Sequence, residues 1–155
     1  MSYTCIWIHA VWSTKCRYPF LTDAIRNRVI FHILENARNN DIYIDHVNGY
    51  LDHLNALISL GKTQNICEVM QLIKGESSFW INNKGLCQLK FAWQREFYAV
   101  SLGISELNTT RKYIRNQFEH HRKVEFEAEL NKMAEEYHLE KINKWMLLKH
   151  NHSLV

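Results

Sequence analysis

The sequence predicts an α+β fold, in which helices pack on one antiparallel sheet, and three observations support this class. Segments dense in β-branched and aromatic residues alternate with segments whose apolar residues recur at helical spacing. Their order is strand, helix, strand, strand, helix, strand, followed by further helical stretches. The 155 residues include one proline and five glycines, so no linker rich in these residues divides the chain.

The first part of the chain is expected to form two strands and a helix. Residues 3–13 are rich in Ile, Val, Trp and Thr, which favour a strand. Thr22 or Asp23 can cap a helix that runs to about residue 39 and has apolar residues every three or four positions. Residues 41–48 alternate as a second strand, and Asn48-Gly49 indicates a turn after it.

The rest of the chain repeats this pattern and then turns helical. We expect a strand at 52–60, a helix at 65–82, a strand at 91–101, and helices at 105–123 and 125–148. This order predicts a ferredoxin-like split β-α-β sheet with helices on one face, plus a tyrosine-bearing helix and a C-terminal helix. The second face of such a sheet is open and needs nucleic acid, a partner subunit or a further helix to cover it.

Composition restricts the function classes without choosing one. A net charge of +3 permits nucleic-acid binding but does not establish it. The four cysteines are scattered and form no C-x-x-C pair, which excludes a zinc ribbon or a redox motif. No segment approaches the ~20 apolar residues of a membrane span, and the first residues do not resemble a signal peptide. We therefore expect a cytoplasmic protein with free thiols and no membrane partner.

The strand at 52–60 carries two polar residues on one side. Leu54, Ala56 and Ile58 share the other side, which suits a cover of helices. His53 and Asn55 would lie ~7 Å apart along the strand, where they can share one metal ion. The alternative is that these two residues form the solvated polar end of an edge strand.

The helix at 105–123 carries a candidate nucleophile. Tyr113 and Gln117 are four residues apart and therefore share a helix face. A phenol with a pKa near 10 is a poor nucleophile, but a nearby base, or a metal that polarises the target phosphate, would let it attack. The Gln117 amide oxygen can bind the same metal. Alternatively, the Tyr113 ring packs against protein with its hydroxyl in water, and Gln117 lies on the surface.

Four segments, in order, resemble motifs of the single-tyrosine HUH transposases of the smallest bacterial insertion sequences and their REP-associated relatives. These segments are residues 9–18 (HAVWSTKCRY), 48–59 (NGYLDHLNALIS), 73–78 (IKGESS, with Trp93-Gln94 following) and 112–117 (KYIRNQ). The resemblance implies a single-tyrosine HUH transposase domain at 1–123, with 124–155 as its C-terminal helical extension.

The resemblance also implies a mechanism. A homodimer binds single-stranded DNA, often with a hairpin, and Mg²⁺ or Mn²⁺ grips the scissile phosphate. By position, Tyr113 is the nucleophile that forms a 5′-phosphotyrosine link, and His53 and Gln117 are metal ligands. In such transposases the tyrosine helix often packs against the metal site of the partner chain, so active sites shared between chains are expected.

One position departs from the family pattern. The second histidine of the HUH motif is Asn55 here, which completes the predicted metal set with an amide oxygen. His46 or Asp52 could compensate for the lost imidazole, and Asp52 could instead orient His53. The prediction is an active nuclease with weakened metal binding. The alternative is a decayed transposase that still folds, dimerises and binds DNA.

Basic and aromatic residues lie near these motifs. The predicted phosphate contacts are Lys15, Arg17, Arg111, Lys112 and Arg115. Unpaired bases could stack on Trp12, Tyr18, Trp93, Phe97 and Tyr98, although Trp12 and Trp93 also suit a core. RNA-binding domains use the same element order, but this chain lacks their RNP signature.

Overall fold

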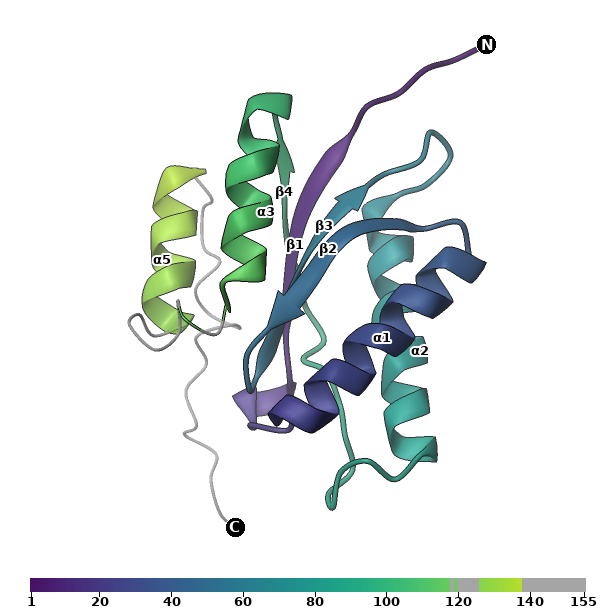
Figure 1. Ribbon diagram of the computed structural model, residues 1–155, viewed down its shortest axis with the longest axis vertical. Helices are drawn as coiled ribbons and strands as arrows, with labels where there is room; N and C mark the ends of the chain where they lie inside the picture. Colours follow the sequence, from purple (N-terminus) through teal and green to yellow (C-terminus); the bar gives the residue numbers. More distant parts are fainter. Residues whose placement is uncertain (118, 120–125, 138–155) are drawn as a thin grey trace.

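The computed structural model describes residues 1–117, 119 and 126–137, and it confirms the α+β class. A four-stranded antiparallel sheet has the spatial order β2-β3-β1-β4 (Figure 1). Its strands are β1 (Trp7–Ser13), β2 (Tyr43–Gly49), β3 (His53–Ser59) and β4 (Tyr98–Leu102). The described helices are α1 (Asp23–Asn39), α2 (Ile66–Asn83), α3 (Leu107–Arg115) and α5 (Phe126–Glu136).

Helices lie on both faces of the sheet. The helices α1 and α2 cover one face, while α3 and α5 lie on the other (Figure 1). Alternate residues of β3 follow this division, because Leu54, Ala56 and Ile58 join the core under α1 and α2, whereas Leu57 packs with Ile114 of α3 and Leu130 of α5. The face that the sequence left open is therefore covered by further helices of the same chain.

Several predicted boundaries were wrong, and packing explains the largest error. The fourth strand covers only Tyr98–Leu102, and the aromatic run before it is irregular. Phe91 and Trp93 lie in the core without pairing as a regular strand, apart from one bridge between Trp93 and Thr14. The aromatic residues there are buried in the core and do not pair in a strand ladder. The first strand likewise begins at Trp7 and not near residue 3.

The hairpin between β2 and β3 also differs from the prediction. Asn48 and Gly49 remain in β2, paired with Asn55 and Leu54, so the turn falls at residues 50–52. Helix α1 begins at Asp23 as predicted, although the Thr22 side chain makes no capping hydrogen bond. The predicted helices at 105–123 and 125–148 lie partly outside the described residues. Within the described part, no helix is long and apolar enough to cross a membrane.

Candidate active site

The polar end of β3 is buried in the middle of the sheet. His53 and Asn55 are both 0% exposed, and β3 lies between β2 and β1. The interpretation of a solvated edge strand is therefore wrong. Helix α3 packs over β2 and β3 on this face, so any polar group here needs partners within the protein.

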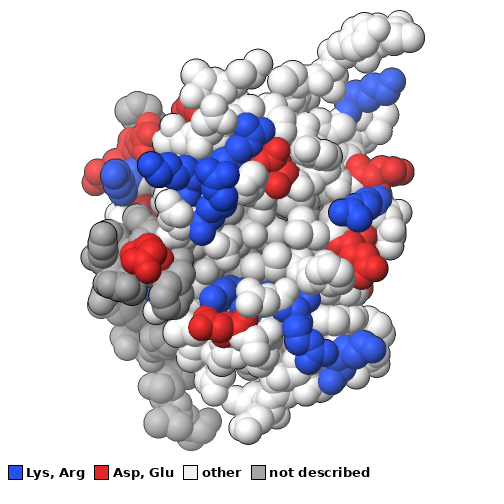
Figure 2. All heavy atoms as spheres, viewed as in Figure 1, with Lys and Arg blue, Asp and Glu red and all other residues white. Residues whose placement is uncertain are grey.

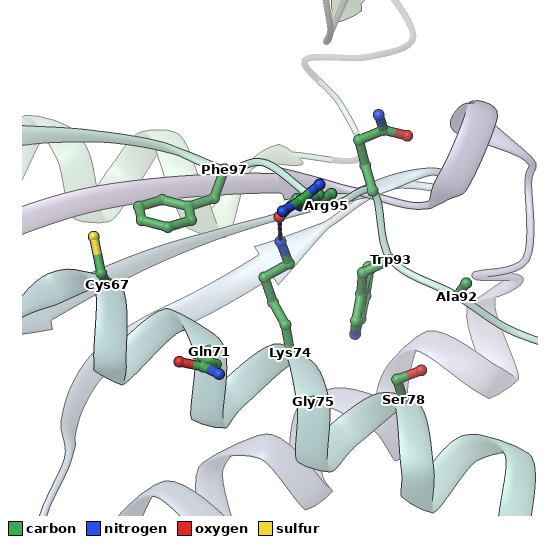
Figure 3. A pocket seen from close by; sticks show the side chains of 10 residues that line it. Cys67, Gln71, Lys74, Gly75, Ser78, Ala92, Trp93, Arg95 and Phe97 are labelled. Atoms are coloured by element: carbon green, nitrogen blue, oxygen red, sulfur yellow. Dashed lines mark hydrogen bonds between the residues drawn. The ribbon is translucent and has the colours of Figure 1, made fainter.

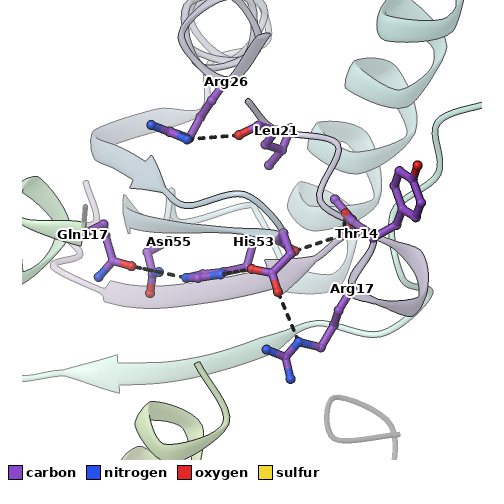
Figure 4. Close-up of polar contacts among 9 residues, drawn as sticks. Thr14, Arg17, Leu21, Arg26, His53, Asn55 and Gln117 are labelled. Carbon is purple, nitrogen blue, oxygen red and sulfur yellow. Dashed lines mark hydrogen bonds and ion pairs between the residues drawn. The ribbon is translucent and has the colours of Figure 1, made fainter. Parts of the chain in front are cut away.

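Gln117, two residues beyond α3, supplies such a partner. Its Oε1 lies 3.3 Å from His53 Nε2 and accepts a hydrogen bond from Asn55 Nδ2 at 3.0 Å (Figure 4). Gln117 is fully buried, so it is not a surface residue. One chain thus brings together all three side chains that the sequence predicted as metal ligands.

Asp52 lies behind His53 and fixes the imidazole. His53 Nδ1 is 2.8 Å from Asp52 Oδ1, and Arg17 Nε donates to Asp52 Oδ2 at 3.2 Å (Figure 4). Burial opposes ionisation of Asp52, but its hydrogen bond to His53 and the charges of His53 and Arg17 outweigh burial and lower its pKa. Carboxylates in this position commonly orient metal-binding histidines. His46, the other candidate compensator, pairs with Asp45 instead.

His9 belongs to the same cluster, although the sequence analysis gave it no role. It lies on β1, is 4% exposed, and places Nε2 2.8 Å from Asn55 Oδ1. Burial lowers the pKa of His9 to about 4, so the imidazole is neutral at pH 7. The sequence signal that was available is strand alternation, which places His9, Val11 and Ser13 on one side of β1. The contact with Asn55, however, depends on the register of the two strands.

Tyr113 lies on α3 against this cluster. Its ring meets the His9 ring edge-on, with centroids 5.8 Å apart, and its backbone oxygen accepts from Gln117 Nε2 at 3.3 Å. The hydroxyl is buried, so the interpretation that placed it in water is wrong. Tyr113 also lines a pocket of about 390 Å³, together with His9 of β1, Thr109 and Thr110 of α3, and Glu129 and Lys132 of α5.

Glu129 of α5 is a second residue that the sequence analysis missed. It lines the pocket of Tyr113 and is 4% exposed. Burial, together with the negative charge of Asp52, raises the pKa of Glu129 to about 8. A carboxylic acid that is largely protonated at neutral pH therefore faces the same pocket as the tyrosine. In the sequence it appears as one of many acidic residues in a helical tail.

The five predicted DNA-binding residues fall into two groups. Lys15, Lys112 and Arg115 are exposed, and Lys and Arg side chains gather over α3 on the face that Figure 2 shows. Arg17 is bonded to Asp52, as described above. Arg111 donates to both oxygens of Asp45, at 2.8 and 3.1 Å. These two arginines therefore already have carboxylate partners within the protein.

Most of the candidate base-stacking aromatics fill the core. Trp12 and Trp93 are buried in the hydrophobic core under α1 and α2, as the core interpretation predicted. Phe97 is partly buried against the same hydrophobic core. Tyr98 is 4% exposed and packs with Leu57 and Ile114 under α3 and α5, which makes the stacking prediction wrong for this residue. Tyr18 remains accessible, with 46% of its surface exposed.

The third motif segment, residues 73–78, serves packing. Lys74 Nζ donates to the backbone oxygens of Arg95 and Glu96, at 2.6 and 3.1 Å (Figure 3). Ser77 Oγ accepts from Trp93 Nε1 at 2.9 Å. These three bonds tie α2 to the irregular segment before β4, beside a pocket of about 350 Å³. This segment therefore supports the sheet on the face opposite Tyr113.

Comparisons with known proteins agree with the fold and identify a family. The model of the IS200-like transposase family matches residues 2–117. One similar solved structure is a protein from Deinococcus radiodurans R1 assigned as a transposase, with a TM-score of 0.60 and 16% identity over 75% of this chain and 93% of that chain. Another is a REP-associated tyrosine transposase bound to a REP hairpin, with a TM-score of 0.57 and 19% identity over 80% of this chain and 76% of that chain.

No curated protein sequence matches the chain. At such low identity the two solved structures establish the fold alone, whereas the family model spans all four motif segments, the last of which ends at Gln117. The chain therefore belongs to the IS200-like transposase family, whose members move DNA.

Proposed function

We propose that this transposase nicks and rejoins single-stranded DNA through a 5′-phosphotyrosine intermediate on Tyr113. The observation that carries the proposal is the convergence of the tyrosine helix on the polar end of β3, where Gln117 reaches His53. A fold neighbour is bound to a REP hairpin, which supports single-stranded DNA with a hairpin as the partner of this chain too.

The residues of the cluster fit a hard divalent cation. His53 Nε2 and Gln117 Oε1 lie 3.3 Å apart, and Asn55 is the third member. An imidazole and two amides are neutral donors, which suits Mg²⁺ or Mn²⁺ with low affinity. No group of three His, Cys, Asp or Glu residues forms a metal site among the described residues. When bound, the cation would polarise the scissile phosphate.

The chemistry then falls to Tyr113. Its phenol oxygen attacks the phosphorus, and the bond from phosphorus to the 3′-oxygen breaks. The phenol loses its proton, and the departing 3′-oxygen takes one up to become a hydroxyl. One phosphodiester is exchanged for another, so the reversed reaction with a new 3′-end joins strands without a nucleotide cofactor. Because the hydroxyl is buried beside α5, DNA can reach it only when α5 moves.

Exposed basic residues would hold the DNA near this site. Lys112 and Arg115 flank the tyrosine on α3, and Lys15 lies in the loop after β1. A homodimer with shared sites was expected, and within one chain Gln117 reaches His53 and bonds to the backbone oxygen of Tyr113. We therefore propose that each protomer can assemble its own site, and that a homodimer would serve to hold two DNA ends.

A decayed transposase that only binds DNA is the second candidate. One contact favours it, because the Asn55 amide turns its N–H group toward Gln117 Oε1, where a cation would need an oxygen. The two functions differ in whether Tyr113 ever becomes covalently bound to DNA.

A covalent-adduct assay tests the proposal. The protein is incubated with a labelled hairpin oligonucleotide and Mn²⁺, and adducts are resolved on a denaturing gel. We expect an adduct with the wild type and with Tyr18→Phe, the matched control, and none with Tyr113→Phe. An adduct that survives Tyr113→Phe refutes the assigned nucleophile. Binding without any adduct, even at high metal, refutes the nuclease and supports the binding protein.

A further inference from the structure

The Asn55 side chain is held at both ends of its amide. Its Oδ1 lies 2.8 Å from His9 Nε2, and its Nδ2 donates to Gln117 Oε1 at 3.0 Å. All three side chains are buried, with exposures of 0 to 4%. Among the described residues, His9 and Gln117 supply the side-chain hydrogen bonds of Asn55. The direction in which its oxygen points is therefore set by these two partners.

In this orientation the Asn55 amide presents its N–H group, and not its oxygen, to the place where a cation would bind. The amide orientation can be reversed. A half-turn of the Asn55 amide would point Oδ1 toward Gln117 Oε1, where two oxygens repel each other unless a cation lies between them. The same half-turn would point Nδ2 at His9 Nε2, which must then accept a hydrogen bond. A neutral imidazole has one donor and one acceptor nitrogen, and the two can exchange.

We propose that His9 is a positioning residue: by changing its imidazole tautomer, it allows Asn55 to turn its oxygen toward a Mg²⁺ or Mn²⁺ ion that His53 and Gln117 also bind. In the observed arrangement His9 Nε2 carries the proton and donates to Asn55, and in the loaded arrangement His9 Nδ1 carries it. The proposal rests on the metal-assisted function proposed above.

Histidine is well suited to this position. A lysine at position 9 could only donate and a carboxylate could only accept, so either would fix Asn55 in one orientation. The His9 ring also packs edge-on against Tyr113, which holds the imidazole in place while its proton changes nitrogen. A change at the metal ligands would then leave both the strand and the tyrosine helix where they are.

A double-mutant cycle on Mn²⁺ affinity, measured by electron paramagnetic resonance without DNA, separates positioning from packing. His9→Phe keeps the ring but removes both nitrogens, so we expect a loss of about tenfold, as for other residues that orient metal ligands. Asn55→Asp offers an oxygen in either orientation, so His9→Phe should cost nothing in the N55D background. His32→Phe, far from the cluster and bonded to Glu76, is the control and should bind like the wild type.

An equal loss in both backgrounds would overturn the proposal, because it would show a packing defect. A thermal unfolding curve for each variant confirms that it folds. A second measurement follows the tautomer directly, with ¹⁵N-labelled histidine in long-range proton–nitrogen spectra. On addition of Mg²⁺, the His9 proton should move from Nε2 to Nδ1.

The outcomes also distinguish a failure of this proposal from a failure of the metal-assisted function on which it rests. If Mg²⁺ shifts the resonances of His53 while His9 keeps its proton on Nε2, the metal site stands and the role of His9 is refuted. If neither histidine responds to saturating Mg²⁺ or Mn²⁺, both the metal-assisted function and this proposal are refuted.

Discussion

Replacing the buried acid beside the tyrosine should change how stability depends on pH. Burial raises the pKa of Glu129 from 4.5 to about 8, so between these values the folded protein holds a proton that the unfolded chain has released. The stabilisation that protonated Glu129 contributes is therefore complete below its pKa in the unfolded chain. It is lost as the pH rises through its pKa in the folded protein. Glu129→Gln keeps the neutral form at every pH and should remove this loss.

The size of the effect follows from the two pKa values. Between pH 6 and pH 8, ionisation of Glu129 should cost the wild type about 2 kcal/mol that Glu129→Gln does not lose. Urea unfolding of both proteins at pH 6, 7 and 8 measures the difference, in which all other titrating groups cancel. Amide hydrogen exchange in α5 should show the same trend, since release of this helix alone would also free the carboxylate.

The control is Glu135→Gln, an exposed residue of the same helix, which should follow the wild-type curve. If Glu129→Gln and the wild type give parallel curves, Glu129 is not buried in solution. Helix α5 would then not cover the tyrosine as described, and the requirement for its movement during DNA binding would disappear.

Three further predictions concern the cluster and the basic surface. Burial lowers the pKa of His9 to about 4, so stability should be lost as the pH falls from 6.5 to 4, by up to about 3 kcal/mol; acid titrations of His9→Phe should lack this loss. Asn55→His should increase Mn²⁺-dependent nicking, since imidazole binds Mn²⁺ more strongly than an amide does, and unchanged nicking would show that metal affinity is not limiting. Lys112→Ala and Arg115→Ala should each weaken DNA binding and reduce the salt slope by about one in fluorescence anisotropy. Arg111→Ala should affect folding more than DNA binding, and an equal loss of salt slope in all three variants would contradict this division.

The parts of the site that could be predicted depend on short-range periodicity. Alternation along one strand is enough to place His53 and Asn55 on the same side of β3, opposite Leu54 and Ala56. Helical spacing similarly placed Tyr113 and Gln117 on one face, and the bond from Gln117 to the backbone of Tyr113 preserves this relation beyond the end of α3. Neither inference required knowledge of what packs against the element.

The parts that could not be predicted depend on distant contacts. His9 meets Asn55 only because β1 and β3 pair in one particular register, with Val11 opposite Asn55. Glu129 reaches the pocket only because α5 docks on a face that an isolated sheet would leave open. The aromatic run before β4 misled the strand prediction for the same reason, since long-range burial, not local pairing, selects aromatic residues there.

The burial of this cluster explains why its donors are neutral. An unpaired charge on a covered sheet face is costly, and the two carboxyl groups nearby avoid that cost in different ways. Asp52 stays ionised through His53 and Arg17, whereas Glu129 keeps its proton at neutral pH. The groups that would face the proposed cation, an imidazole and two amides, instead satisfy one another by hydrogen bonds. Such a set binds a free ion only weakly, since the ion must break these bonds without meeting a negative ligand. The DNA phosphate supplies that charge, so cation and DNA should strengthen each other's binding.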